Sequence, residues 1–432
     1  MNSRHSEWLD SIPPDWNCIT LDQIGEVISG STPSRAIPKY WDGEYPWVTP
    51  GELSNLKTSH LTETRDYLTR TGLLACSSGL LASETLLITT RATIGAKVLA
   101  GVPVSTNQGF KSIVFKSSEN PNFYFHLFDL MPGELKRLAS GTTFLEISGH
   151  EFKKIRVPHP CPLEQRRIAE ILDTVDDAIR RTDQVIEKLQ QMKQGLLHDL
   201  LTRGIDENGE LRPPPEEAPH LYKDSPLGLI PKMWGVISLR DALSVKLGFA
   251  FHSEDYADEG LLNFRVSNIG RPVHDFGERR FLPTRFWNQF PGQQLHGGEI
   301  VVVMVGATVG KLGRVPFDVC PALQNQNMWN LVPNESIYRE FLWLVLPDAI
   351  RRHLSLSQGS ARDFLTQKDF LRTLIVVPSY SEQRSFSTKA VVLDTQLNAE
   401  ETYLEKVLTL KKGLMDDLLT GKVRVNVPEG EC

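Results

Sequence analysis

The chain has 432 residues, which is too long for one ordinary hydrophobic core and indicates two to four domains. A composition of 40% hydrophobic and 23% charged residues is that of a folded globular protein and excludes a disordered one. The formal net charge of −6 excludes a protein that is basic throughout, so DNA contact would depend on local positive patches or on a partner.

The chain contains five cysteines, an odd number, and no Cys-x-x-Cys pair. Neither a disulfide framework nor a zinc site is therefore expected, and a reducing cytoplasm fits this pattern. Residues 1–16 lack the apolar core of a signal peptide. No run approaches the roughly 18 apolar residues that a membrane helix needs, so we expect a cytoplasmic protein without membrane contact.

Residues 1–160 are predicted to form a first β-rich domain. Short β-like runs, such as Glu84–Thr90 and Phe110–Phe115, alternate with turns that are rich in Gly, Pro, Ser and Asn. This spacing of runs and turns is typical of a strand-rich domain that also contains a few helices.

Residues 161–205 are predicted to form one long spacer helix. Its apolar residues alternate in steps of four and three, which is the heptad pattern of a helix that packs along another helix. Gly204 lies where this helix is expected to stop. The residues expected on the packing face are Ile168, Leu172, Val175, Ile179, Ile186 and Leu189.

Residues 206–227 are polar, Pro-rich and acidic, and are predicted to be an exposed linker. A second β-rich domain at 228–380, a second spacer helix at 381–421 and a tail at 422–432 are predicted to follow. Each helix would be about 60 Å long at 1.5 Å per residue, and we expect the two to pack antiparallel with the domains at opposite ends. The expected packing residues of the second helix are Phe386, Leu393, Leu397, Leu404 and Val407.

The second half of the chain repeats the first at a constant 218-residue offset. The segments Glu164–Arg166, Asp199–Thr202, Asn107–Gln108 and Trp16 return as Glu382–Arg384, Asp417–Thr420, Asn325–Gln326 and Trp234. Each half is therefore one complete structural unit, and the chain is expected to be a pseudo-two-fold body. Such a body suits a partner that is itself two-fold or that offers two sites at a fixed distance, as duplex DNA does.

No catalytic constellation is found. The best candidate, Val301–Lys311, is a strand that runs into a Gly-rich turn with a lysine and so is similar to a phosphate-binding loop. Only three residues separate Gly306 from Gly310, where that motif needs four, and Leu312 replaces the Ser or Thr that would hold magnesium. The histidines form no cluster of metal-ligand type. The sequence therefore predicts no catalytic residue and no metal site.

Several turns carry side chains suited to reading base edges. Asn and Gln can bond adenine in two places, Arg can do so to guanine, and Ser or Thr can bond either. The candidate reading segments are Ser31–Trp47, Asn107–Gln108 and Ser140–Thr143 in the first half, with Ala250–Asn268, Asn325–Asn327 and Gln358–Arg362 in the second. The candidate DNA-binding residues are Arg35, Lys39, Asn107, Gln108, Thr142, Thr143, His252, Arg265, Asn268, Asn325, Gln326 and Arg362.

Two observations qualify these candidates. A turn Asn is more often a backbone cap than a base contact, and the Asn-Gln pair does not vary between the halves, as readers of different sequences should. A local positive patch in the second half favours DNA contact. Its members, which face only Asp275 and Glu278 across the same stretch, are Arg265, Arg271, Arg279, Arg280 and Arg285.

The chain resembles the specificity subunits of type I restriction-modification enzymes over nearly its whole length. The motifs that carry the resemblance are Pro162–Ala169 at the helix start, Leu196–Ile205 at the helix end, Tyr222–Pro231 with Trp234 at the restart, Pro46–Val48 and the Asn-Gln pair. The start of the second helix departs from the pattern, since Ser385–Ser387 replaces the usual charged residue, Ile and Ala.

The resemblance implies an α+β fold with two β-rich target recognition domains separated by two long antiparallel coiled-coil helices. Each domain would read one half of a bipartite, asymmetric DNA site, while the helices set the gap and dock two adenine-N6 methyltransferase subunits. The chain itself would bind no cofactor. S-adenosylmethionine, ATP and magnesium would be used by partner subunits, with restriction or translocase subunits expected among them. A methylation-only or type IIB-like system remains an alternative.

Two other classes of function are weighed against this one. A coiled-coil scaffold that binds only proteins would leave the arginine patch unexplained and would not require two diverged β-rich domains. A phosphate-loop enzyme is disfavoured by the spacing of Gly306 and Gly310. The expectation is therefore a non-catalytic, DNA-reading subunit.

Overall fold

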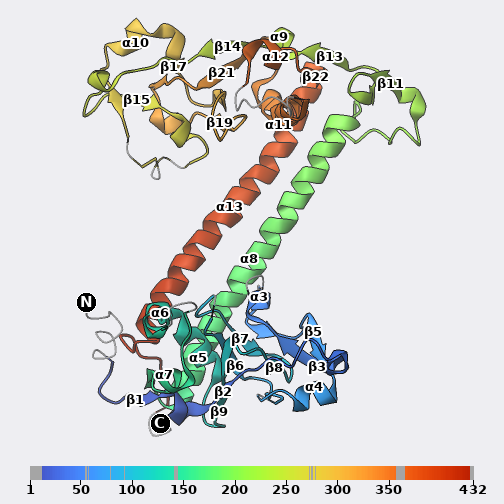
Figure 1. The fold of residues 1–432 in the computed structure, drawn as a ribbon. Coiled ribbons are helices and arrows are strands. Elements are labelled where there is room, and N and C mark those ends of the chain that lie inside the picture. The colour runs from blue at the N-terminus through green and yellow to red at the C-terminus, as the bar shows by residue number, and fades with distance from the viewer. Residues whose placement is uncertain are drawn as a thin grey trace. The chain divides into compact units, whose positions relative to one another are not determined.

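The computed structural model describes residues 12–428, apart from 54, 55, 57, 78, 92, 141–144, 272, 274, 275, 278 and 357–364. The chain divides into two compact units: unit 1 is Met1–Ile186 with Ala399–Cys432, and unit 2 is Glu187–Asn398. Each unit joins a strand-rich part to segments of both long helices, α8 (Pro162–Thr202) and α13 (Tyr380–Leu418), which Figure 1 shows as uninterrupted. The predicted α+β class, with two strand-rich parts, two long helices and an internal repeat, is confirmed.

Unit 1 contains a five-stranded sheet in the order β2-β9-β6-β7-β4, a three-stranded sheet β5-β3-β8 and the pair β1-β10. Strand β6 is buried at every position because it lies between β9 and β7. The strands are β1 (Asn17–Thr20), β2 (Gly25–Ser29), β3 (Trp41–Val48), β4 (His60–Leu61), β5 (Asp66–Leu68), β6 (Leu86–Thr89), β7 (Lys97–Ala100), β8 (Ser105–Thr106), β9 (Phe110–Phe115) and β10 (Arg156–His159). The short helices are α2 (Leu21–Ile24), η1 (Pro38–Tyr40), α3 (Pro50–Leu53), α4 (Arg70–Leu74), α5 (Pro121–Leu127), η2 (Phe128–Leu130), α6 (Pro132–Leu138) and α7 (Gly149–Lys153).

The main core of unit 1 joins its five-stranded sheet to both long helices. Large apolar side chains from the sheet, from α5, from the start of α8 and from the end of α13 are buried together. These include Leu86, Ile113, Phe123, Leu127, Ile168, Leu172, Met415 and Leu418. Each such side chain stabilises the unit by roughly 1.5–3 kcal/mol relative to its exposed state. The strand-rich part is therefore held on the helices by a continuous core.

Unit 2 contains two four-stranded sheets, β14-β21-β18-β19 and β16-β15-β20-β17, and the pairs β13-β22 and β11-β12. The strands are β11 (Tyr222–Ser225), β12 (Gly228–Pro231), β13 (Gly235–Ser238), β14 (Leu243–Leu247), β15 (Leu261–Phe264), β16 (Phe281–Leu282), β17 (Gln294–Leu295), β18 (Ile300–Val303), β19 (Leu312–Arg314), β20 (Ala322–Gln324), β21 (Met328–Pro333) and β22 (Leu374–Val377). The helices are η3 (Pro219–Leu221), α9 (Leu239–Ala242), η4 (Ser253–Asp255), η5 (Val266–Asn268), α10 (Phe286–Gln289), η7 (Pro291–Gln293), η8 (Phe317–Val319), α11 (Arg339–Leu356) and α12 (Gln367–Phe370). Its main core again joins a sheet to both long helices, through Leu200 of α8 and Phe386 of α13.

The internal repeat is present in the strand registers. Strand β1 pairs Asn17 with His159, and β13 pairs Gly235 with Val377, so both members of the pair have moved by the repeat offset. In the same way, β2 pairs Gly25 with Phe115 and β14 pairs Leu243 with Pro333. Strands that connect each part to its helix therefore keep the offset seen in the sequence.

The offset is not constant inside the strand-rich parts, so the expectation of a constant offset is wrong there. The parallel pair Val48–Thr106 of unit 1 corresponds to Phe264–Gln324 of unit 2. The second member of this pair keeps the repeat offset, whereas the first member falls short of it by two positions. Residues lost in one loop are regained in another, because surface loops tolerate changes in length better than strands do.

Cysteine chemistry differs from the expectation at one position. Cys161 is disulfide-bonded, whereas Cys18, Cys76 and Cys320 are free. The spacing of the cysteines along the sequence did not predict this disulfide. In the part of the chain that the structure describes, no helix combines the length and apolarity that crossing a bilayer requires. Among the same residues, no three His, Cys, Asp or Glu side chains gather as a metal site.

Candidate nucleic-acid interface

Each strand-rich part is anchored to the start of one long helix through a buried glutamate. In unit 1, Trp16 Nε1 donates to Glu164 Oε2 at 2.9 Å, and in unit 2, Trp234 Nε1 donates to Glu382 Oε2 at 3.0 Å. Both glutamates and both tryptophans are buried. The repeat therefore preserves a polar contact across 148 residues in each unit.

An arginine that follows the other long helix completes each anchor. Arg424, beyond α13, donates from Nε to Glu164 Oε1 at 2.6 Å, while Arg212, beyond α8, donates from a terminal nitrogen to Glu382 Oε1 at 2.6 Å. Hydrogen bonds to Glu164 and then to Asp15 raise the pKa of Arg424 above its usual range. The buried carboxylates are thus compensated by charge-assisted hydrogen bonds, which are the strong kind.

The glutamine next to each glutamate ties the helix start to a neighbouring helix. Gln165 Oε1 accepts from the backbone N–H of Asn120 at 2.9 Å, just before α5. Gln383 Oε1 accepts from the backbone N–H of Tyr338 at 2.8 Å, just before α11. The repeated Glu-Gln pairs are therefore structural anchors between each strand-rich part and its long helix.

The loop between β2 and β3 in unit 1 is braced by two tryptophans. Trp47 Nε1 donates to the carbonyl oxygen of Ser31 at 3.1 Å, and Trp41 Nε1 donates to that of Ser34 at 3.2 Å. The backbone N–H of Ser77 also donates to Ser31 Oγ, at 2.8 Å. These bonds hold the loop in one conformation, which lowers the entropy lost when a ligand binds.

Arg35 and Lys39 are exposed on this braced loop. The Arg35 guanidinium carbon lies 3.8 Å from the centre of the Trp41 ring, and one terminal nitrogen lies 2.5 Å from Asp66 Oδ2. The side chain is nevertheless 56% exposed. Arg35 is therefore an exposed guanidinium that Trp41 and Asp66 orient, and guanidinium groups are common partners of guanine.

The two residues of the Asn107-Gln108 turn differ. Asn107 holds the turn together, and Gln108 is exposed. Asn107 Oδ1 accepts from the Gly109 N–H at 2.8 Å, and Asn107 Nδ2 donates to Thr32 Oγ1 at 2.9 Å. Gln108 is exposed and accepts a hydrogen bond from Thr32. The backbone-cap explanation therefore accounts for Asn107, and Gln108 is the member of the pair that faces solvent.

The equivalent turn in unit 2 makes the same close approach to a glycine. A Cβ atom added to Gly30 would lie 2.0 Å from the carbonyl oxygen of Asn107, and one added to Gly248 would lie 1.9 Å from that of Asn325. Only glycine fits at such a distance. Gln326, like Gln108, is exposed. The close approach explains why this turn repeats.

The remaining unit 2 candidates are spread over the segment from 252 to 268. His252 is exposed, and its backbone N–H donates to Asp255 Oδ2 at 2.8 Å. Arg265 is partly buried, and its backbone N–H donates to Asn268 Oδ1 at 2.8 Å. Asn268 is buried, so it is better explained as the cap of η5 than as a surface reader. Thr142, Thr143 and Arg362 lie outside the described residues.

An aromatic cluster that the sequence reasoning missed braces the reading loop of unit 2. Phe249, which follows Gly248, is exposed, and its ring centre lies 4.8 Å from that of Phe290. Phe251 packs on Phe290 as well, at 5.1 Å. The signal that could have indicated it is the pair of Phe-rich segments at 249–251 and 286–290. These phenylalanines stand at other positions than the tryptophans of unit 1, because the strand register makes Asn263 the equivalent of Trp47.

The arginine patch of unit 2 borders this cluster. Arg280 lies 5.6 Å from the ring centre of Tyr256, and Arg285 lies 5.4 Å from that of Phe286. Arg271, Arg279 and Arg285 are exposed. Asp275 and Glu278, the acids nearest in sequence, lie outside the described residues. Exposed guanidinium groups beside aromatic rings can contact phosphates or base edges.

The predicted packing residues of the long helices are all buried or partly buried. The buried ones are Ile168, Leu172, Ile186, Phe386, Leu397 and Val407, and the partly buried ones are Val175, Ile179, Leu189, Leu393 and Leu404. Asp176 of α8 pairs with Lys411 of α13 at 2.6 Å in unit 1, and Lys193 pairs with Asp394 in unit 2. The two pairs are related by the repeat offset, and in each unit early positions of one helix meet late positions of the other.

The geometry defines a class of protein: two strand-rich parts, each anchored through a Trp-Glu contact to one of two long helices. The family model "Type I restriction modification DNA specificity domain" matches residues 13–191 and 231–407. These two matches span most of the chain. The chain therefore belongs to the type I restriction modification DNA specificity domain family.

Relatives are similar over most of their length. The type I restriction enzyme MjaIX specificity subunit of Methanocaldococcus jannaschii is 26% identical over 423 residues, which is 96% of this chain and 95% of that protein. The EcoBI specificity subunit of Escherichia coli is 24% identical over 363 residues, or 79% of this chain and 73% of that protein. The crystal structure of a type I restriction-modification S subunit from M. genitalium has the same fold, with a TM-score of 0.60, 16% identity and 97% and 98% of the two chains covered.

Proposed function

We propose that this chain is the DNA-sequence-reading subunit of a type I restriction-modification complex, and that each strand-rich part, or recognition domain, reads one half of a bipartite asymmetric site. The observation that carries the proposal is one anchor used twice with a different reading surface on each copy. Glu164 and Glu382 each accept a hydrogen bond from a tryptophan of their own unit, whereas the loop proposed to read DNA is braced by Trp41 and Trp47 in unit 1 and by phenylalanines in unit 2. Different readers on equal anchors suit a site whose halves differ.

The proposal assigns two roles to α8 and α13: they set the gap between the half-sites, and they dock two adenine-N6 methyltransferase subunits. Val185 and Met192 of α8 are exposed and seven positions apart, so they lie on one helix face. Tyr403 and Leu410, their counterparts in α13 at the repeat offset, are exposed as well. These four apolar side chains are 43–55% exposed. Apolar positions left in solvent twice at the same register favour two copies of one partner.

Catalysis is assigned to partners in this proposal. The methyltransferase subunits would use S-adenosylmethionine, and restriction or translocase subunits would use ATP and magnesium. The Gly-rich turn after β18 has a packing role that supports this division of labour. A Cβ atom added to Gly310 would lie 2.9 Å from Ile350 of α11, so this turn packs against a helix.

Exchange of one recognition domain tests the reading role. Residues 10–160 would be replaced by the equivalent domain of a relative, and N6-methyladenine would be mapped in DNA from cells that carry the chimaera and its methyltransferase. One half of the methylated site should change, while the other half and the gap stay the same. The matched exchange of 228–380 should change the opposite half. A change in both halves from either exchange would show that one domain does not read one half-site.

A further inference from the structure

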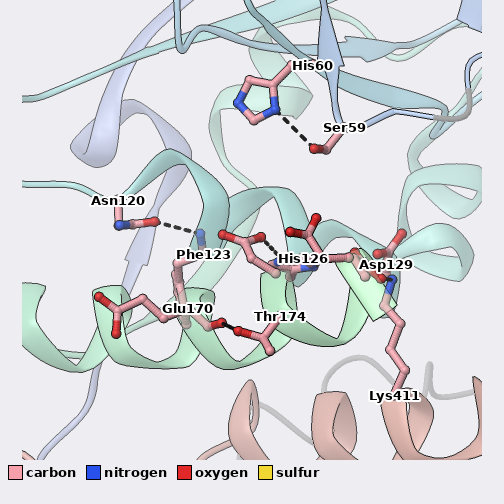
Figure 2. Close-up of polar contacts among 12 residues, drawn as sticks. Ser59, His60, Asn120, Phe123, His126, Asp129, Glu170, Thr174 and Lys411 are labelled. Atoms are coloured by element: carbon pink, nitrogen blue, oxygen red, sulfur yellow. Dashed lines mark hydrogen bonds and ion pairs between the residues drawn. The ribbon is translucent and has the colours of Figure 1, made fainter. Parts of the chain in front are cut away.

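A buried polar link joins the recognition domain of unit 1 to the long helices. Figure 2 shows His126 on α5 between α8 and the sheet. His126 is fully buried, and its Nε2 donates to Asp173 Oδ1 of α8 at 2.7 Å. The other ring nitrogen, Nδ1, lies 3.8 Å from Asp176 Oδ2. A histidine of the recognition domain thus faces two carboxylates on one helix.

The same link extends to the second long helix. Asp176 forms its other ion pair with Lys411 of α13, at 2.6 Å. Beside it, Lys97 of β7 pairs with Asp129 at 2.6 Å, and Lys97 Nζ lies 3.9 Å from the ring centre of Phe125. Burial lowers the pKa of Lys97, and Asp129 opposes that effect. The charges that surround the link are therefore arranged in pairs across β7, α5, α8 and α13.

Unit 2 lacks the histidine-aspartate link at the equivalent place. The helix-to-helix pair is kept, as Lys193 with Asp394. A cation over an aromatic ring is kept too, because Arg314 of β19 lies 4.7 Å from the ring centre of Trp343. The residues equivalent to His126 and Asp173 are Leu344 and Val391.

The two replacing side chains of unit 2 border a cavity. Leu344 is buried, but Val391 is exposed. A cavity of about 430 Å³ lies beside both, lined also by Trp343 and Ala390. Apolar contacts have no preferred direction, whereas a hydrogen bond weakens steeply when its angle changes. At this place unit 1 therefore has a directional hydrogen bond, where unit 2 has the two apolar side chains Leu344 and Val391.

We propose that His126 and Asp173 are positioning residues that fix the direction in which the recognition domain of unit 1 leaves the helix pair. The consequence is a narrower range of gaps between half-sites that the complex accepts. This hydrogen bond can serve that purpose because His126 is fully buried and leaving its ring unpaired is costly. This inference rests on the proposed function, since it concerns how sharply the spacing of a bipartite site is read.

The test uses the complex of the full chain with its methyltransferase, on duplexes that carry both half-sites at the native gap or at one base pair more or less. The variant H126L/D173V installs the residue pair found in unit 2. We compare the methylation rate at the native gap with the rate at the shifted gaps. We expect this ratio to fall by roughly tenfold, which matches the free energy of one hydrogen bond to a charged group. Base preference within each half-site should not change.

Two further variants serve as controls for this test. H126L alone leaves Asp173 close to solvent and should lower the ratio in the same way, even if the double variant fails to fold. D177N, which removes the exposed pair of Asp177 with Arg180 on α8, should leave the ratio unchanged. An unaltered ratio in folded H126L would overturn the inference. Equal methylation at all gaps by the unmodified chain would instead refute the ruler role in the proposed function.

Discussion

Unit 1 and unit 2 share the buried Trp-Glu-Arg anchor but differ in what surrounds it. In unit 1, Glu119 accepts hydrogen bonds from Tyr124 at 2.7 Å, from Gln165 at 3.1 Å and from His159 at 3.2 Å. The equivalent positions in unit 2 are Ile337, Leu342, Gln383 and Val377. Of the four, only the glutamine is kept, and there it donates to the carbonyl oxygen of Ser336 at 3.1 Å.

The difference shows which contacts the repeat has to preserve. The anchor binds a strand-rich part to a helix start and recurs in both units. The residues around the anchor are polar in unit 1 and mostly apolar in unit 2, so they differ as a set. Replacing one partner alone would leave a buried polar group without a hydrogen bond, which costs about 1–3 kcal/mol. The same holds for His126 and Asp173, whose equivalents are both apolar.

Removal of the anchoring arginine should have the largest effect and should separate the two units. In unit 2 the side chain of Arg212 is 15% exposed, so R212A would leave Glu382 buried without its counter-charge. We expect a loss of about 3–5 kcal/mol in the stability of unit 2, measured by hydrogen exchange of the amides in β13 and β22. Amides of β1 and β10 in unit 1 should keep their protection.

R424A is the matched variant in unit 1. Arg424 is 41% exposed, so water can replace part of its compensation of Glu164. We expect a smaller loss, about 1–2 kcal/mol, confined to β1 and β10. Equal losses in the two variants, or a loss that spreads to both units, would contradict the view that each anchor serves its own unit.

Acid should destabilise unit 1 through Glu119. Burial raises the pKa of this carboxyl, but hydrogen bonds from His159, Tyr124 and Gln165 outweigh burial and lower the pKa from its usual value of 4.5 to about 2. A lowered pKa in the folded state stabilises the fold above pH 4.5, and this contribution is lost as the pH falls from 4.5 to about 2. The full shift corresponds to roughly 3 kcal/mol, and we expect about 2 kcal/mol because solvent screens part of it, measured by hydrogen exchange in unit 1 against pH.

Two references accompany the acid measurement. E119Q removes the titrating carboxyl and should flatten the pH dependence of unit 1 between pH 4.5 and 2. Unit 2, with Ile337 at the equivalent position, is an internal reference within the same chain. If E119Q loses stability with acid as steeply as the unmodified chain, another group is responsible.

The smallest effect is expected on the reading surface of unit 1. R35A removes the guanidinium that Trp41 and Asp66 orient, and should weaken DNA binding by about 1–2 kcal/mol with relaxed preference at one base. K39A, on the same loop, should weaken binding without regard to sequence. Affinity for duplexes that vary one base at a time measures both. If R35A instead relaxed the base preference in the half-site that the 228–380 exchange alters, Arg35 would not read the half-site assigned to unit 1.

Much of the fold could be predicted because its signals are local. The heptad spacing that begins at Ile168 and Phe386 predicts α8 and α13, since a helix that packs on a neighbour must place apolar residues every three or four positions. Repeated segments such as Glu164–Arg166 predict two units of one fold. Offsets inside the recognition domains could not be predicted, because loop insertions that cancel leave no periodic trace.

The candidate site was less predictable, because it depends on what each side chain meets. Asn107 and Asn268 have the chemistry of adenine readers, yet one is engaged within its turn and the other is buried as a cap. Arg35 retained its place as an exposed, oriented donor. The aromatic brace around Phe290 forms between segments that are well separated along the chain, so residue type alone did not indicate it.

The sequence by itself determined the duplication, the long helices and the family, because repeats and periodicity are written along the chain. Only the tertiary structure decided which charges meet. Glu164 and Arg424 are 260 residues apart, Glu382 and Arg212 are 170 apart, and His126 and Asp173 are 47 apart. Such pairs form when the chain folds back on itself, and a hydrogen bond depends on distance and angle rather than on residue type. The pair of His126 with Asp173 distinguishes two units that the repeat alone presents as equal.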